Sequence, residues 1–259
     1  MKNNMTIVTV ALLLAWAGPA VAQDEEQDSM TVIPVETWTC NYRDGKGPAD
    51  LDKVIAGWNK WMDEEGVDTY AAATVTPWYY GEGAFDVGWI GYWTDGNSMG
   101  AGTDRYLASG GDEAAGFAEV VACDTHSQFA STMIKAPGDN TLAGDFVLYF
   151  SDCDIRDGAD WEAAMDGLQA WGEYMTEQEY DNGLWAMFPA FGSGDMDFDF
   201  KYVAAYDSYT TAGAGWEKYG NGGGWEKRLE LLGDKIDCDV NRVYNARVVR
   251  SMPAETDGN

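Results

Sequence analysis

The chain has 259 residues, of which 44 are acidic, 16 are Lys or Arg and one is His, so that its formal net charge at pH 7 is −28. A field of this sign repels nucleic acids and anionic membrane surfaces, and we expect neither as a partner. The 12 Trp, 14 Tyr and 9 Phe supply enough apolar area for a core, which excludes a wholly disordered chain. The acidity has two explanations: adaptation to a salty habitat, or a surface that gathers divalent cations.

Residues 1–22 have the pattern of a secretory signal peptide. Lys2 supplies the positive start, residues 7–16 are apolar, and Ala-Val-Ala at 20–22 fits the small-residue cleavage rule. No later apolar run approaches the roughly 18 residues that a membrane helix needs. We therefore predict a mature protein that begins at Gln23, is periplasmic or secreted, and is not inserted in a membrane.

An acidic segment at 23–34 precedes a unit at 35–136 that is predicted to form β-α-β-β-α-β. Its strands are expected near residues 37–42, 70–80, 85–93 and 125–134. The first helix opens after Pro48 and ends before Gly66, and its apolar residues recur at steps of three and four: Leu51, Val54, Ile55, Trp58, Trp61 and Met62. A Gly-rich loop with short helical pieces follows and leads into a second helix near residues 112–121.

A linker at 135–142 leads to a second unit at 143–252, which is followed by a polar tail at 253–259. The second unit repeats the helical stripe with Trp161, Ala164, Met165, Leu168, Trp171 and Met175. Its second helix is expected near residues 225–232 and its last strand near residues 240–249.

The two units are copies of each other. Cys40 aligns with Cys153 at an offset of 113 residues. The same offset matches Trp58 with Trp171, Phe85-Asp86 with Phe198-Asp199, and Gly102 with Gly215. After a two-residue insertion, Cys123-Asp124 aligns with Cys238-Asp239. Matches at a nearly constant offset over this length indicate an internal duplication.

This order of elements resembles the ferredoxin-like fold, and two joined copies resemble the dimeric α+β-barrel superfamily. The expected fold class is α+β, with tandem βαββαβ (ferredoxin-like) repeats pairing as a pseudo-dimeric α+β barrel. The resemblance covers nearly all of the mature chain and rests on element order and duplication rather than on a motif. It implies small-molecule chemistry, because the superfamily includes cofactor-free oxygenases and haem proteins.

Four cysteines at equivalent positions of an exported duplication predict two disulfides, for which three pairings are open. No CxxC or Cys-His spacing supports a metal site instead. The resemblance implies Cys40–Cys123 and Cys153–Cys238, because the first and last strands of a ferredoxin-like unit lie side by side.

His126 is the single histidine and the one weak candidate for a general base or haem ligand. Its partner in the second repeat is Asn241, so a structural role on a half-exposed strand is the alternative. Arg43 and Arg156 follow the first strand of each copy and are candidates for binding a small anion or orienting a substrate. Each also stands before Asp-Gly, which is strong turn chemistry, and we favour this explanation by a turn.

Asp195, Asp197 and Asp199 alternate along a predicted strand and could face a Ca²⁺ ion together. Their spacing is not that of an EF-hand, and the first copy has only Asp86 at the matching place. We predict a solvated strand face and no specific metal site.

Aromatic residues line one face of the third strand in each copy. Trp89 and Trp93 of the first copy correspond to Tyr202 and Tyr206 of the second. If they face the helices they are ordinary core. If they face the barrel interior they line a shared apolar pocket for a flat ligand, with the Gly-rich stretches 99–102 and 221–224 at its mouth.

Two classes of function fit these observations. The preferred one is an exported protein that binds a small apolar or aromatic ligand or a protein partner, with no cofactor. The alternative is a small-molecule enzyme of the α+β-barrel type, either cofactor-free and oxygenase-like or haem-dependent. Because residues that titrate near neutral pH are nearly absent, the sequence favours binding over catalysis without deciding between them.

Overall fold

The computed structural model describes residues 31–81, 84–138, 144–192, 194 and 196–253. The predicted signal peptide and parts of the acidic segment, the linker and the tail lie outside these residues. Within them, no helix combines the length and the apolar composition that crossing a membrane requires.

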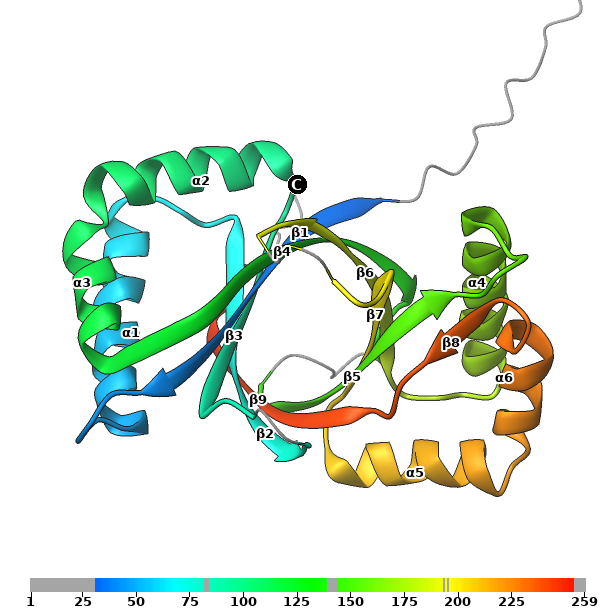
Figure 1. The fold of residues 1–259 in the computed structure, drawn as a ribbon. Helices are drawn as coiled ribbons and strands as arrows, with labels where there is room; N and C mark the ends of the chain where they lie inside the picture. The colour runs from blue at the N-terminus through cyan, green and yellow to red at the C-terminus, as the bar shows by residue number, and fades with distance from the viewer. Residues whose placement is uncertain (1–30, 82–83, 139–143, 193, 195, 254–259) are drawn as a thin grey trace, which may run out of the picture. The chain divides into compact units, whose positions relative to one another are not determined.

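Eight of the described strands close into an antiparallel barrel (Figure 1). In chain order they are β1 (Val32–Tyr42), β2 (Tyr70–Tyr79), β3 (Val87–Trp93), β4 (Val121–Lys135), β5 (Phe146–Ile155), β6 (Gly183–Phe191), β7 (Phe200–Tyr206) and β9 (Arg242–Arg250). The order around the barrel is β7-β6-β4-β1-β3-β2-β9-β5, and β5 pairs back onto β7. The short strand β8 (Ile236–Cys238) also pairs with β5.

Each half of the chain contributes four neighbouring strands to the barrel. The halves meet where β2 pairs with β9 and where β4 pairs with β6, both antiparallel. We refer to these junctions as the β2–β9 seam and the β4–β6 seam. Because both seams are continuous strand pairings, the two halves share one sheet.

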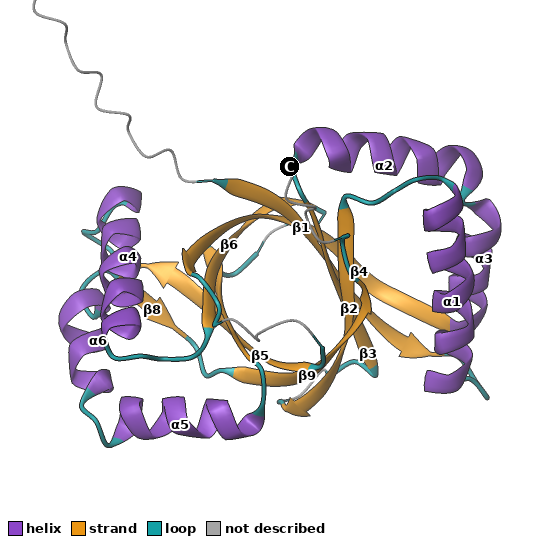
Figure 2. Ribbon diagram, turned by 180° about the vertical axis from the view of Figure 1, so that it is seen from behind, coloured by secondary structure: helices purple, strands orange, loops and turns teal. Residues whose placement is uncertain are grey.

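Helices cover the outer face of each half (Figure 2). The first half carries α1 (Pro48–Glu64), α2 (Gly96–Ser109) and α3 (Gly111–Val120), and the second carries α4 (Trp161–Glu177), α5 (Tyr209–Gly220) and α6 (Gly224–Leu232). The predicted apolar stripe of α1 is buried, with Pro48 at its first position and Gly66 in the left-handed conformation just beyond its end.

The prediction of a Gly-rich loop after β3 is wrong, because α2 is a full helix of 14 residues. The side chain of Asp95 caps it by accepting from the Ser98 amide at 2.8 Å. Gly102 lies against the indole of Trp93, which a Cβ at that position would overlap, and Gly215 of α5 lies close to Tyr206, with which a Cβ would make a tight contact. The glycines therefore serve close helix–strand packing rather than a loop.

The predicted last strand of the second half, near residues 240–249, is confirmed as β9. The short strand β8, which was not predicted, precedes it, and Val240 between the two strands is 87% exposed. The first strand, in contrast, is longer than predicted and begins at Val32.

The barrel interior is filled with apolar side chains from both halves. On each strand these residues alternate with residues that contact the helices. The buried members are Val35, Ala73, Val75, Phe129, Phe146, Leu148, Met187, Val203, Ala205 and Ala246. The helices and strands of each half enclose further clusters of their own.

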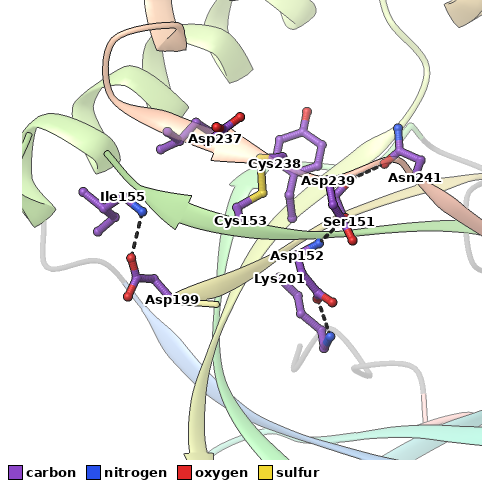
Figure 3. The surroundings of a disulfide bond; sticks show 12 residues. Ser151, Asp152, Cys153, Ile155, Asp199, Lys201, Asp237, Cys238, Asp239 and Asn241 are labelled. Atoms are coloured by element: carbon purple, nitrogen blue, oxygen red, sulfur yellow. Dashed lines mark hydrogen bonds and ion pairs between the residues drawn. A yellow bond between two sulfur atoms is a disulfide. The ribbon is translucent and has the colours of Figure 1, made fainter. Parts of the chain in front are cut away.

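Both predicted disulfides are confirmed. Cys40 bonds to Cys123 across β1 and β4, and Cys153 bonds to Cys238 across β5 and β8 (Figure 3). The repeated Asp of the Phe-Asp pairs has a structural role, because Asp86 accepts from the Tyr42 amide at 2.9 Å. Asp199 accepts from the Ile155 amide at 2.7 Å in the second half.

Candidate functional site

The aromatic stripe of the first half faces its own helices. Trp89 packs edge-on against Trp58 of α1, with ring centroids 5.2 Å apart, and Trp93 belongs to the same buried cluster. The space that Gly91 leaves between them is occupied by Tyr70 from the neighbouring strand, because a Cβ on Gly91 would overlap the Tyr70 hydroxyl.

The aromatic stripe of the second half lies under a different set of helices. Tyr202 accepts a hydrogen bond from the Trp171 indole at 2.9 Å, and Tyr206 packs in the same cluster. The prediction of one cavity shared by the two stripes is therefore wrong. The alternation along β3 and β7 turns both stripes outward, whereas the opposite face of the strands fills the barrel.

The two arginine candidates tie turns to neighbouring elements, which are helix α3 for Arg43 and strand β8 for Arg156. Arg43 donates through Nε to the Ala118 carbonyl at 2.5 Å, and Arg156 donates through Nε to the Ile236 carbonyl at 3.1 Å. Each precedes a glycine with positive φ, at Gly45 and Gly158. The turn interpretation is thus the one that the structure supports, and neither arginine lines a groove described below.

The acidic residues do not converge on a cation. Asp195 lies outside the described residues, while Asp199 is engaged with a backbone amide. In the part of the chain that the structure describes, no group of three or more His, Cys, Asp or Glu could hold a metal ion. The absence of a specific Ca²⁺ site remains a prediction.

A hollow beside the second disulfide is bordered by Asp152, Asp154, Asp197, Phe198, Asp237, Cys238 and Asp239 (Figure 3). The Nζ of Lys201 contacts Asp152 at 2.5 Å and lies 4.1 Å from the Phe198 ring centroid. Arg242 pairs with Asp152 as well, at 3.0 Å. Burial lowers the pKa of Lys201, and its hydrogen bond to Asp152 opposes that shift. Asp152 is therefore paired with two cations, Lys201 and Arg242.

A groove of about 470 Å³ runs along the β2–β9 seam, between α1 and the start of α5. Its apolar lining is Tyr42, Pro48, Leu51, Val87, Phe146, Val147, Tyr209 and Ala246. Its polar lining is Thr74, Thr76, Asp145, Asp207, Ser208, Asn245 and Arg247. Both halves contribute, so the groove exists only because the halves join here.

The groove is open because small residues stand where the β4–β6 seam has aromatic ones. At the β4–β6 seam, Trp161 covers Phe188 with ring centroids 4.2 Å apart. Pro48 occupies the position of Trp161 in the first copy. Thr76 lies opposite Asn245 on β9, as Phe188 lies opposite Ala130 on β4. Where the β4–β6 seam has the large rings of Trp161 and Phe188, the β2–β9 seam therefore has only the smaller side chains of Pro48 and Thr76.

The polar groups of the groove are held in place by hydrogen bonds. Tyr209 donates its hydroxyl proton to Asn245 Oδ1 at 2.8 Å. Arg247 pairs with Asp52 of α1 at 2.5 Å. Positive and negative groups therefore both border the groove, which suits a neutral ligand better than a charged one.

His126 ends a hydrogen-bond chain that begins in the core of the first half. The Trp89 indole donates to the Tyr70 hydroxyl at 2.7 Å, and Tyr70 donates to Glu36 Oε1 at 2.5 Å. The other oxygen of Glu36 lies 3.0 Å from His126 Nε2. Burial, and next the Glu36 carboxylate, raise the pKa of Tyr70 well above its usual value, so this tyrosine stays protonated as the donor. The chain links a buried phenol to a half-exposed imidazole.

The residues around His126 do not fit a haem group. Its Nε2 is taken by Glu36, and its ring stacks on Trp38 with centroids 3.4 Å apart. A planar macrocycle needs an open slot beside its axial ligand, whereas the layers under the helices are filled by aromatic side chains. We therefore derive no chemistry through haem.

The antiparallel barrel with helices on its outside is a mixed α+β fold, similar to that of dimeric α+β-barrel proteins. No family model matches the chain, and no curated protein matches it in sequence.

Among solved structures, a proposed monooxygenase from Fusobacterium nucleatum superposes with a TM-score of 0.55 at 11% identity, over 85% of this chain and 94% of that one. A proposed monooxygenase from Lactobacillus acidophilus gives 0.53 at 9% identity, over 85% and 95%. A proposed chlorite dismutase gives 0.52 at 12% identity, over 85% and 96%. At these identities the likeness shows the fold alone.

Sequence reasoning missed the groove, although a signal for it was present. Alignment of the copies sets Pro48 against Trp161, so the first copy lacks a large ring at the start of a helical stripe that is apolar in both copies. The link from Glu36 to His126 had no such signal, because 90 residues separate them in the chain.

Proposed function

We propose that this protein is an exported binding protein that takes a small, neutral, partly apolar ligand in the groove of the β2–β9 seam. In this proposal the chain is a fused pair of ferredoxin-like units that act as a pseudo-dimer, and the groove belongs to their junction. The ligand class is the one that the sequence favoured, but its location differs, because the aromatic stripes are core.

Export is supported by three features. Two disulfides form without any free cysteine, which suits an oxidising compartment. Residues 1–22 have the signal-peptide pattern, and the net charge of −28 suits a protein that stays dissolved in a salty medium.

The observation that carries the binding proposal is the difference between the seams. At one junction the rings of Trp161 and Phe188 are in contact, whereas the equivalent place at the other junction is a groove. A groove of about 470 Å³ lies within the range of about 300–1,000 Å³ that small-molecule sites occupy. Its mixture of apolar and polar lining residues is also that of such sites.

A reciprocal exchange tests the proposal. Pro48 and Trp161 both stand at the first position of a helix, where proline is tolerated, so each can take the other's residue without breaking the helix. With the neutral fluorescent probe N-phenyl-1-naphthylamine, we expect saturable binding to the native protein and its loss in Pro48→Trp. Trp161→Pro is the matched control and should keep the native site.

Equal probe binding by the native protein and by Pro48→Trp would show that the groove is not the site. Circular dichroism of both variants separates a filled groove from a misfolded chain.

A second candidate function is proton-transfer catalysis at His126 by an oxygenase-like enzyme without a cofactor. It is favoured by the chain from Tyr70 through Glu36, which orients the imidazole as an acid or base. The proposed monooxygenases of the same fold support this class. Oxygen uptake with a panel of hydroquinones tests it: turnover by the native protein that disappears in His126→Asn supports it, and an absence of turnover removes it.

A further inference from the structure

An aromatic ledge continues the groove onto the surface. Trp78, Tyr79 and Tyr209 are 55%, 64% and 41% exposed, which is unusual for large rings in one place. The Trp78 ring centroid lies 6.0 Å from that of Tyr209 and 6.2 Å from that of Tyr79. Trp78 and Tyr79 come from β2 and Tyr209 from α5, so the ledge, like the groove, spans the seam.

The rings form an open surface rather than a slot. The Trp78 plane is inclined by 52° to Tyr209 and by 69° to Tyr79. The three rings therefore do not form a pair of parallel walls between which a flat aromatic ligand could stack on both of its faces. A ligand with a puckered, partly aliphatic face can instead rest on a single exposed ring.

Hydrogen-bonding groups border the ledge on the groove side. Tyr209 and Asn245 are hydrogen-bonded to each other, and both line the groove. Because Tyr209 also belongs to the ledge, the ledge is continuous with the polar lining of the groove. Asp145, Asp207 and Ser208 add oxygen acceptors, and Arg247 adds donors. Closely spaced acceptors and donors around an aromatic ring suit a ligand that carries many hydroxyl groups.

We infer that the groove and its aromatic ledge bind a neutral oligosaccharide, with one sugar ring on Trp78 and its neighbours along the groove. The C–H face of a pyranose packs on the indole, while its hydroxyls meet the amide, carboxylate and guanidinium groups of the rim. The net charge of −28 disfavours uronate or sulfated chains. This inference rests on the proposed function, because it names the ligand class of the same groove.

Titration calorimetry with neutral hexasaccharides of glucose, xylose, mannose and N-acetylglucosamine tests the inference, with polygalacturonate as the acidic comparison. We expect one neutral series to bind with one site per chain. Trp78→Ala and Tyr209→Ala should each weaken that binding about tenfold, as truncation of an anchoring aromatic ring does. Trp216→Ala, which removes a ring of 69% exposure that does not line the groove, is the control and should bind as the native protein does.

The outcomes separate the two proposals. If no neutral hexasaccharide binds, but the naphthylamine probe binds and is blocked by Pro48→Trp, the oligosaccharide is ruled out while the groove stands as a binding site. If the groove takes neither sugars nor the probe, both proposals fail. Stronger binding of polygalacturonate, or equal loss in Trp78→Ala and Trp216→Ala, also overturns the inference.

Discussion

The two halves of this barrel share a frame and differ in what fills it. Each half has a disulfide from its first strand, to β4 in the first half and to β8 in the second. Each also has an arginine that holds the turn after the first strand, and an aspartate that accepts a hydrogen bond from a backbone amide at the end of that strand. Each also has a helical glycine pressed on an aromatic ring of the third strand. These shared contacts determine the fold of the unit.

The differences lie at positions that the frame leaves free. Ala72 stands opposite Gly91 in the first half, which makes room for the Tyr70 ring, whereas Leu184 stands opposite Ala204 in the second. Pro48 opens one seam and Trp161 closes the other. Function in a duplicated chain is therefore best sought where the copies disagree.

The largest expected effect tests the shared frame. The two disulfides span 83 and 85 residues, so their loss should be nearly equal, about 4–5 kcal/mol each in the chain-entropy model. Urea unfolding of the Cys40→Ser/Cys123→Ser and Cys153→Ser/Cys238→Ser variants measures both. A difference of more than about 2 kcal/mol between them would show that the halves are not held by equivalent frames.

The next effect concerns the space under the helices of the first half. Gly91→Ala places a methyl group into the Tyr70 hydroxyl, and we expect a loss of about 1–3 kcal/mol, as for other overpacked cores. The double variant with Tyr70→Phe should recover part of this loss, because the overlapping oxygen is gone. Denaturant unfolding of the single and double variants measures the coupling, and strict additivity would contradict the predicted overlap.

The shared contacts of the two halves could be predicted from the sequence, because the residues that make them occur at equivalent positions in both copies. Recurrence of cysteines, of Phe-Asp pairs and of the helical stripe revealed the duplication, and the resemblance of the repeated element order to a ferredoxin-like unit implied the barrel and the disulfide pairing. The direction of the aromatic stripe could not be settled in this way, since alternation places Trp89 and Trp93 on one face without saying which face the helices cover.

The Gly-rich stretches misled for a related reason. Glycine lowers helix propensity, so a sequence such as residues 96–102 predicts a loop. In the folded chain Gly102 is needed for contact with Trp93, and the packing of that ring outweighs the intrinsic cost. The groove and the hydrogen-bond chain depend on residues that are distant in sequence, and periodicity says nothing about them.

The third prediction asks what closing a seam contributes to stability. Trp161 is 47% exposed and packs on Phe188. Its replacement therefore removes fewer contacts than the replacement of a fully buried tryptophan would. We expect Trp161→Pro to lose about 1–2 kcal/mol, less than the roughly 3–5 kcal/mol of a fully buried tryptophan. Thermal unfolding measures this, and an unchanged midpoint would mean that the Trp161–Phe188 contact adds no stability.

The fourth prediction concerns alkaline pH. Burial raises the pKa of Tyr70 above the ordinary value of 10.0, and it also raises the pKa of Tyr202. Because the folded protein keeps these protons while the unfolded chain releases them, the stability they contribute is complete below pH 10 and declines as the pH rises.

By pH 11 we expect a loss of about 1 kcal/mol for Tyr70, whose pKa is raised well above its ordinary value. Unfolding at pH 9, 10 and 11 measures the decline, which Tyr70→Phe should make less steep. An identical slope in that variant would show that Tyr70 ionises as freely in the folded protein as in the unfolded chain.

The smallest expected effect is that of His126→Asn, which gives the first half the residue that the second half has at Asn241. His126 and Glu36 have side chains 48% and 23% exposed, and a pair so close to solvent contributes less than about 1 kcal/mol. Glu36 keeps its hydrogen bond from Tyr70 in the variant, and an asparagine amide can still donate to it. What the variant loses is the stack on Trp38 and the imidazole itself.

Glu36→Gln is the informative comparison. Glutamine retains the shape of the side chain and removes the carboxylate charge that both Tyr70 and His126 contact. A loss well above 1 kcal/mol in His126→Asn would make the histidine part of the frame. A small loss would leave proton transfer as the remaining reason for a histidine at this position in only one of the two copies.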